Sequence, residues 1–199
     1  KGEEYSFVKR QIESQDCNVL TMNIGVLGDT ELFTTDIPNE LVAKAGGAEI
    51  AKLQKDKDRG KAMEAMAKGA ATLTRQYFDE EKFHGVLGMG GSGGTSVISS
   101  AMRALPIGVP KVLVSTVAAG DTTLITGVKD ITMIPSIVDV AGINPISEKV
   151  FKEAVGAICG MTRMDYSLSG ESKPVICASM FGNTTECVNM CRESLVEKG

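Results

Sequence analysis

The sequence predicts an α/β fold in which a doubly wound, mainly parallel β-sheet has helices on both faces. Short apolar stretches alternate with helical patterns along the chain, as is typical of parallel strands joined by crossover helices. The stretch Val112-Leu113-Val114 is apolar at every position, which indicates a strand buried on both faces. A glycine-rich turn at residues 88–94 separates one apolar stretch from a helical pattern. These three observations favour a Rossmann-like architecture.

The first 81 residues are expected to be mainly helical. Tyr5, Val8 and Ile12 recur at spacings of three and four residues, so they indicate the apolar face of a helix at residues 3–15. The elements expected next are, in order, a strand at 18–25, a loop at 25–37, a short helix from 38 to 46, and a long helix at 58–81.

After residue 81, strands and helices are expected to alternate. A strand before the glycine-rich turn and a helix at 95–103 form the first pair. The elements expected next are strands at 111–115 and 130–134, a helix that begins at 145–147, a strand at 175–179, and a helix at 185–196. Polar residues at 169–173, followed by Pro174, indicate a boundary. We therefore expect an α/β subdomain at 1–170, and at 171–199 only the opening strand and helix of a second one.

The composition narrows the classes of function. The chain has 199 residues, 43% of them hydrophobic, which suffices for one domain or two small ones, and its net charge is −4. No run of Lys or Arg indicates a face that binds nucleic acid. No signal peptide or apolar run of transmembrane length is recognisable, so we expect no membrane association and a cytoplasmic location. The chain lacks an initiator Met and ends directly after a helical pattern, which predicts a fragment of a longer protein.

The five cysteines do not predict a metal site. Their number is odd and their spacings are irregular. Cys187 and Cys191 are four residues apart on an expected helix, but no His or Cys cluster accompanies them. We expect reduced, mostly buried thiols.

The glycine-rich turn is the strongest candidate for a functional site. Five glycines fall within its seven residues, so its backbone N–H groups are not covered by side chains. Such amides at the start of a helix, with its partial positive charge, favour the binding of a phosphate or another anion. The residues concerned are Gly90, Gly91, Ser92, Gly93 and Gly94, with Thr95 opening the helix.

Two known nucleotide-binding motifs match this turn only incompletely. A Walker A loop requires Lys-Ser or Lys-Thr after the glycines, and no such pair follows. Residues 88–93 match G-x-G-x-x-G, but a dinucleotide site also needs an acidic residue at the end of the next strand. That strand ends at Ser115 and Thr116, and the first acid after it is Asp121. A plainer alternative is a tight turn whose glycines only permit close packing.

Polar residues outside the turn are further candidates for ligand contact. Arg59 stands in the first turn of the long helix, where the helix dipole disfavours a cation, and arginine suits phosphate by its bidentate geometry. The alternative is a solvated surface arginine. Ser115 and Thr116 follow a strand and are suited either to contact a ligand or to form a turn. His84 has no partner acid or nucleophile in view, so catalytic residues are not predicted.

Several runs of the sequence resemble one protein family. They are GGSGGTS at 90–96, ALPIGVPK at 104–111, STVA at 115–118, AGIN at 141–144 and MFGNTT at 180–185. Through these runs the chain resembles the Tm-one-like family of ATP-binding proteins, typified by a tomato tobamovirus-resistance protein. Most bacterial and fungal members of that family have no assigned function. The resemblance extends over nearly the whole chain.

The resemblance implies that residues 1–170 form a nucleotide-binding subdomain whose ligand is ATP with Mg²⁺. The implied ATP site comprises residues 91–94, Arg59, Gly25 and Val26, and a further segment of which only Lys1 is present. The resemblance also implies a first strand that this chain lacks, and a homodimer. A protein partner is not predicted.

The expected function is therefore that of an ATP-binding domain whose reaction is unassigned. One alternative is part of a kinase or ligase-type enzyme, in which the strand, turn and helix hold ATP for transfer; no evident base or nucleophile supports it. A second alternative is a nicotinamide-dependent oxidoreductase domain. The missing acidic residue after the next strand argues against that reading.

Overall fold

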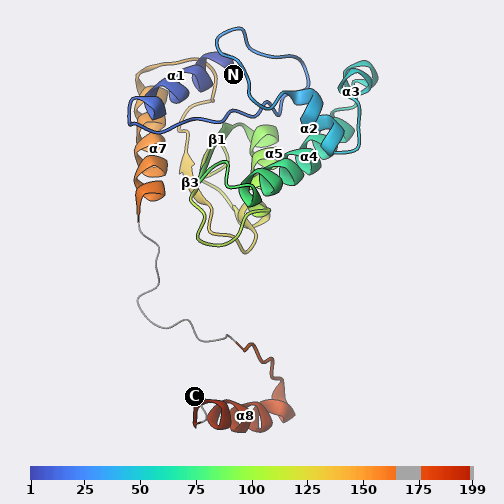
Figure 1. Cartoon of the computed structure of the whole chain (residues 1–199), viewed down its shortest axis with the longest axis vertical. Helices are drawn as coiled ribbons and strands as arrows, with labels where there is room; N and C mark the ends of the chain where they lie inside the picture. Colours follow the sequence, from blue (N-terminus) through green and yellow to red (C-terminus); the bar gives the residue numbers. More distant parts are fainter. Residues whose placement is uncertain (165–175, 198–199) are drawn as a thin grey trace. The chain divides into compact units, whose positions relative to one another are not determined.

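The computed structural model describes residues 1–164 and 176–197 (Figure 1). By its internal contacts the chain divides into two units, Lys1–Asp165 and Tyr166–Gly199. Within the described residues, every helix is too short or too polar to cross a membrane. The sheet and the glycine-rich turn both belong to the first unit.

The sheet of the first unit is entirely parallel. Its strands are β1 (Val86–Gly90), β2 (Lys111–Ser115) and β3 (Thr132–Pro135), in the order β1-β2-β3. Gly90 pairs with Ser115, and Ser115 pairs with Pro135. The carboxyl ends of all three strands therefore meet at one edge, which is where ligands bind in open α/β sheets.

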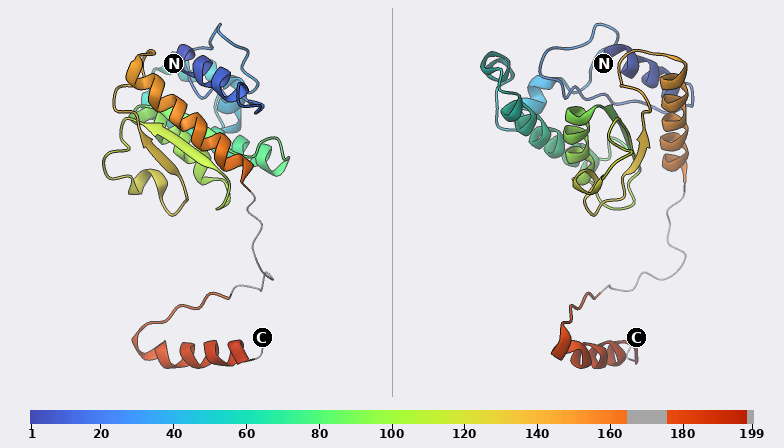
Figure 2. Two further views of the ribbon diagram at one scale, coloured as in Figure 1. Left: turned by 90° about the vertical axis from the view of Figure 1, so that its left-hand side faces the viewer. Right: turned by 180° about the vertical axis from the view of Figure 1, so that it is seen from behind.

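One face of the sheet is covered by α5 (Ser92–Arg103), on which α4 (Arg59–Asp79) and α2 (Asn39–Ala45) are layered (Figure 2). Leu113 of β2 packs with Ile98 and Met102 of α5. The helices α2 and α4 approach each other so closely that a Cβ atom on Gly69 would collide with the Val42 carbonyl. The glycine thus permits the close packing of α4 on α2.

The other face is covered by α7 (Pro145–Arg163) and α1 (Gly2–Glu13) (Figures 1 and 2). Val112 and Val114 pack with Phe151 of α7, while Leu113 between them faces α5. This alternation explains why the centre of β2, residues 112–114, is apolar at every position. The predicted α/β fold with helices on both faces of a parallel sheet is confirmed.

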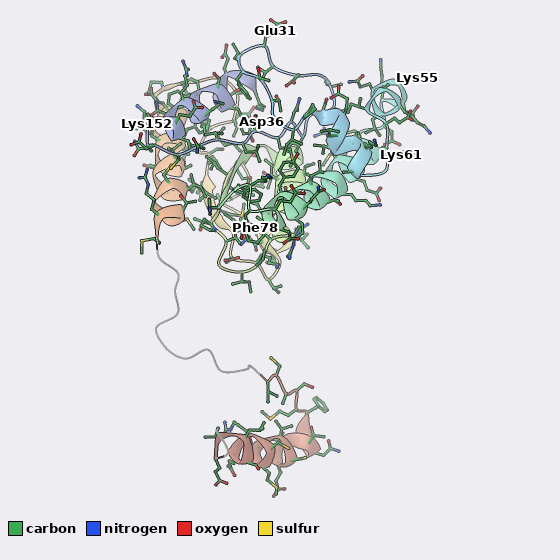
Figure 3. The ribbon with its side chains drawn as sticks, viewed as in Figure 1. Glu31, Asp36, Lys55, Lys61, Phe78 and Lys152 are labelled. Atoms are coloured by element: carbon green, nitrogen blue, oxygen red, sulfur yellow. The ribbon has the colours of Figure 1, made fainter. Side chains whose placement is uncertain are left out.

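The strand predicted at 18–25 is wrong. This stretch forms only an isolated parallel bridge, between Met22 and Ile37. Asp36 (Figure 3) accepts hydrogen bonds from the amide and hydroxyl of Thr21, at 2.8 and 2.6 Å, and so fixes the bridge. Met22 and Ile24 pack against the apolar cluster of α2 and α4. Their apolar character therefore reflects burial beneath helices, which in a short stretch cannot be distinguished from burial in a sheet.

Two short helices were not predicted. They are α3 (Ile50–Asp56) and α6 (Thr123–Thr126). Neither has a side-chain cap at its amino end, and helices of one or two turns carry too little periodicity to be recognised.

The second unit contains η1 (Gly182–Thr184) and α8 (Thr185–Glu197). The helix predicted at 185–196 is confirmed. The strand predicted at 175–179 is wrong for residues 176–179, which have no regular structure; Val175 and the predicted boundary at 169–173 lie outside the described residues. A strand requires a hydrogen-bonding neighbour, and the described part of this unit contains none. The predicted division into two subdomains stays a prediction.

Candidate functional site

The glycine-rich turn lies at the carboxyl edge of the sheet, between β1 and α5. The helix α5 begins at Ser92, whereas the sequence predicted Thr95, so Gly93 and Gly94 belong to its first turn. Gly91 is the N-cap residue, and its carbonyl accepts the first helical hydrogen bond, from the Thr95 amide at 2.8 Å. The amides of residues 92–94 precede that bond, so the helix itself leaves them without acceptors.

The amino end of α5 has no side-chain cap, unlike those of two longer helices. Asp58 caps α4 by accepting from the Lys61 amide at 3.1 Å, and Asn144 caps α7 by accepting from the Ser147 amide at 3.0 Å. Across residues 1–164 no acceptor bonds to the amides of residues 92–94. The start of α5 therefore offers free donors and a partial positive charge to an anion.

Arg59 reaches this uncapped end from the first turn of α4. A Cβ atom on Gly93 would lie 3.1 Å from Nη2 of Arg59 and 3.7 Å from the sulfur of Met63. Among the described residues, no carboxylate forms an ion pair with Arg59. The dipole of α4 disfavours a cation in its first turn. At that place, however, the free guanidinium of Arg59 lies beside the start of α5.

The glycines of the turn do not all serve packing. A Cβ atom on Gly90 would lie 3.1 Å from the backbone of Gly94 and Thr95, a tight contact that favours glycine there. On Gly94 a Cβ atom would meet nothing within 4 Å. The packing alternative therefore explains Gly90 and leaves Gly94 unexplained.

The side chains of Thr95 and Ser115 lie beneath the turn and hold it in place. Both are buried, and their hydroxyls are 2.6 Å apart. Thr95 also donates to the Gly90 carbonyl at 3.3 Å, and Ser115 accepts from the Val117 amide at 3.2 Å. Buried and bonded in this way, the two hydroxyls position the turn and are not directed to a ligand above it.

Thr116 differs from its neighbour because its side chain is exposed. Its amide donates to the Gly90 carbonyl at 3.3 Å, and its hydroxyl lies 3.8 Å from the position that a Cβ atom on Gly91 would take. The Thr116 hydroxyl is thus placed beside the start of α5.

The loop at Gly25 and Val26 lies against the same pair of helices. The Gly25 carbonyl accepts from Asn39 and the Val26 carbonyl from Gln54, each at 2.7 Å. Val26 packs against the cluster that contains Met66 of α4 and Val97 of α5. Neither amide side chain was predicted to matter, because an isolated Asn or Gln carries no recognisable pattern in the sequence.

Lys1 lies apart from these groups. It precedes α1, and its backbone amino group is 3.7 Å from a carboxylate oxygen of Glu4. Within the described ranges no hydrogen bond or ion pair joins Lys1 to Arg59 or to the glycine-rich turn. The structure thus brings together Arg59, residues 90–94 and Thr116, without Lys1.

The chemistry available at this place is that of binding. Amides, a guanidinium and a hydroxyl are hydrogen-bond donors suited to phosphate oxygens. Asp121, the first acid after β2, accepts from the hydroxyl and amide of Thr123, and these bonds lower its pKa. Within the described part of the chain, no group of three His, Cys, Asp or Glu side chains is placed to hold a metal ion.

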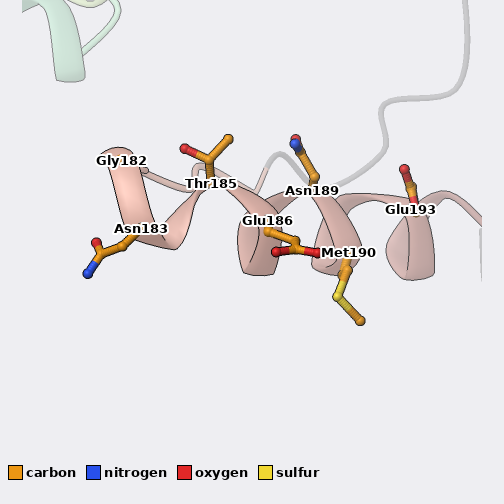
Figure 4. A pocket seen from close by; sticks show the side chains of 7 residues that line it. All are labelled: Gly182, Asn183, Thr185, Glu186, Asn189, Met190 and Glu193. Carbon is orange, nitrogen blue, oxygen red and sulfur yellow. The ribbon is translucent and has the colours of Figure 1, made fainter.

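Two hollows elsewhere on the surface do not include the glycine-rich turn. One, of about 520 Å³, is lined by residues of η1 and α8 alone (Figure 4). The other, of about 550 Å³, lies beside α1 and is lined by Phe7, Arg10, Leu32 and neighbours.

Fold and turn together define an α/β domain of the Rossmann-like class. Residues 1–167 match the N-terminal domain of the uncharacterised protein family UPF0261, and the chain belongs to that family. The resemblance drawn from the sequence runs is therefore confirmed at the level of the family.

Relatives occur in bacteria and in a plant. A UPF0261 protein of Clostridium tetani is 47% identical over 200 residues, covering 100% of this chain and 49% of the relative. A UPF0261 protein of Rhizobium meliloti is 39% identical over 195 residues, covering 98% and 48%. The ToMV resistance protein Tm-1(GCR237) of Solanum lycopersicum is 44% identical over 147 residues, covering 71% and 19%. The chain thus spans about half the length of these bacterial relatives.

Proposed function

We propose that the first unit binds the phosphates of ATP, accompanied by Mg²⁺, at the glycine-rich turn. The observation that carries the proposal is the free guanidinium of Arg59 beside the uncapped first turn of α5. A triphosphate offers acceptor oxygens and negative charge, which match those donors. The resemblance to the Tm-one-like family favours ATP over other phosphate-containing ligands.

The remaining predicted residues take different parts in this proposal. Thr95 and Ser115 hold the turn, and Thr116 adds a hydroxyl beside it. Gly25 and Val26 border the nucleotide from the loop that packs on α4 and α5. Mg²⁺ keeps several waters and is commonly held through phosphate oxygens, so it fits a site with few carboxylates. The homodimer and the cytoplasmic location are carried by the resemblance and the composition alone.

The two enzyme alternatives find less support. A kinase or ligase-type reaction would need a base or an acceptor site beside the turn, and the described residues there are donors. A nicotinamide cofactor would need an acid at the end of β2, and that strand ends at Ser115. Release of ADP in a screen of metabolite acceptors would favour the kinase or ligase alternative over binding alone.

The test is calorimetric titration of the 199-residue chain with Mg-ATP. Arg59→Gln removes the guanidinium, and Lys61→Gln removes an exposed cation two positions later on the same helix. We expect Arg59→Gln to weaken binding about tenfold or more, since hydrogen bonds to charged groups contribute roughly 1.5–3 kcal/mol. Lys61→Gln should change affinity less than about threefold, as for a screened surface charge.

Gly93→Asp provides a second variant. The carboxylate would stand beside Arg59 Nη2, pair with it and repel the phosphates. Mg-ATP should raise the melting temperature of the unaltered chain and leave that of this variant unchanged. Absence of binding by the unaltered chain at millimolar Mg-ATP, or equal losses from Arg59→Gln and Lys61→Gln, would rule the proposal out.

A further inference from the structure

Two thiols far apart in the sequence lie together on the face covered by α1 and α7. Cys159 is buried on α7 and belongs to the main apolar cluster. Cys17, which follows α1, is half-buried and packs against that cluster, so that its side chain is a neighbour of the Cys159 thiol. The expectation of mostly buried thiols is wrong, because Cys177, Cys187 and Cys191 are exposed in the second unit.

The surroundings of Cys17 differ from those of an inert buried cysteine. Arg163, one helical turn beyond Cys159, donates to the Gln15 carbonyl and to the sulfur of Cys17, the latter at 3.6 Å. Cys17 is thus partly exposed beside a positive charge, which is the environment that characterises reactive cysteines. Cys159 is close enough to act as its resolving partner.

We propose that Cys17 and Cys159 form a peroxide-sensitive pair that oxidises to an intramolecular disulfide. The Cys17 sulfur attacks one peroxide oxygen, the O–O bond breaks, and a sulfenic acid and one water result. The Cys159 sulfur then attacks the Cys17 sulfur, so that an S–S bond forms, the S–O bond breaks, and the departing hydroxide takes up the proton of Cys159. In total two thiols lose two electrons and two protons, and one peroxide becomes two waters.

The order of the two steps follows from burial. Burial, together with the contact with Cys17, raises the pKa of the Cys159 thiol to about 11. Cys159 therefore stays protonated at neutral pH until Cys17 has become electrophilic, and Cys17 is the first sulfur to react.

The crosslink would fasten the segment after α1 to α7. The helix α1 itself makes hydrogen bonds to two other parts of the first unit. Glu4 accepts from the Gly142 amide at 2.6 Å, and the Tyr5 hydroxyl bonds to Met89 of β1. Oxidation should therefore hold α1 in place and raise the stability of the first unit.

The test uses the full chain with Cys177→Ser, Cys187→Ser and Cys191→Ser, so that only the proposed pair remains. After brief treatment with hydrogen peroxide, an unreduced digest should contain one peptide pair joined through Cys17 and Cys159. The melting temperature should rise by about 5 °C or more, since closing a loop of about 140 residues stabilises appreciably.

Two controls make the outcome decisive. Cys17→Ser in the same background should give no crosslink, while its circular dichroism spectrum shows that it folds. Treatment in concentrated urea should abolish the preference for this pair, because only the fold brings the two sulfurs together. Oxidation of Cys17 to higher acids with Cys159 left reduced, crosslinking between chains, or no reaction of the folded chain would each overturn the proposal.

Discussion

Two glycines of the turn, Gly90 and Gly94, differ in what a side chain at each would meet. At Gly90 a methyl group would press on the backbone of the first helical turn, whereas at Gly94 it would point into open space. We expect Gly90→Ala to destabilise the fold by about 1–3 kcal/mol. Gly94→Ala should be neutral or stabilising by up to about 1 kcal/mol, because alanine favours a helix. Urea denaturation of both variants would show this, and equal losses would contradict the interpretation.

Lys111 is buried at the start of β2, and its ammonium group is fully bonded. It donates to the carbonyls of Pro106 and Val109 at 2.8 and 2.7 Å, and to Asp130 at 2.8 Å. Lys111→Met removes the donor that these three acceptors share, so we expect a loss of about 2–4 kcal/mol in the free energy of unfolding. The matched control is Lys152→Met, which breaks an exposed ion pair with Glu148 and should cost less than about 1 kcal/mol.

The helix α1 is fastened to the edge of β1 by one side chain. The Tyr5 hydroxyl donates to the Met89 carbonyl at 2.8 Å and accepts from the Met89 amide at 2.9 Å. Tyr5→Phe deprives both backbone groups of a partner, and we expect a loss of about 1–3 kcal/mol. Tyr77→Phe on α4 is the control, since no hydrogen bond of the Tyr77 hydroxyl occurs among the described residues. If the two variants lose the same stability, the contact with Met89 contributes nothing specific.

Titration of Tyr5 offers an independent check on this contact. Burial raises the pKa of Tyr5 to about 12, and the hydrogen bond to Met89 only partly offsets that effect. In an alkaline absorbance titration, one tyrosine should ionise above the usual range, and Tyr5→Phe should remove that component.

The first unit as a whole should lose stability in acid. Burial alone would raise the pKa of Asp130, but hydrogen bonds from Lys111 and the Gly108 amide lower it; hydrogen bonds likewise outweigh burial at Glu4 and Asp36. A carboxyl whose pKa is lowered by folding stabilises the protein above its unfolded pKa, near 4, and that contribution is lost as the pH falls further. The urea concentration at which half of the protein is unfolded should therefore decrease once the pH is lowered below about 4.

Asp130→Asn tests how much one carboxyl contributes to the dependence of stability on pH. The variant should be less stable than the unaltered chain at pH 7, and the difference should shrink as the pH falls below the folded pKa of Asp130. A difference that is constant across the whole pH range would show that Asp130 is not the group responsible.

The elements that were predicted correctly are those with a long or uniform pattern of apolar and capping residues in the sequence. The strand β2 has an entirely apolar centre at residues 112–114. The helix α7 begins with Asn144, Pro145 and Ser147, which cap it as local chemistry requires. The start of α5 was misplaced because Gly93 and Gly94 disfavour a helix in isolation, while packing against the sheet and α4 enforces it. The stretch at 18–25 failed because burial beneath helices and burial in a sheet leave the same apolar signal.

The candidate site was predictable in part. The glycine-rich turn is visible because its glycines are consecutive in the chain, and Arg59 was noticed because it opposes its helix dipole. That Thr95 and Ser115 bond to each other under the turn, while Thr116 stays exposed, depends on strand register and could not be read from the residue types.

The three strands of the sheet, its burial on both faces and the glycine-rich turn before a helix were determined by the sequence alone, since each depends on residues that are close together in it. The approach of Arg59 to Gly93, the contact of Tyr5 with Met89 and the meeting of Cys17 with Cys159 were decided by the tertiary structure. These pairs are far apart in the chain, and only the packing of helices on the sheet makes them neighbours.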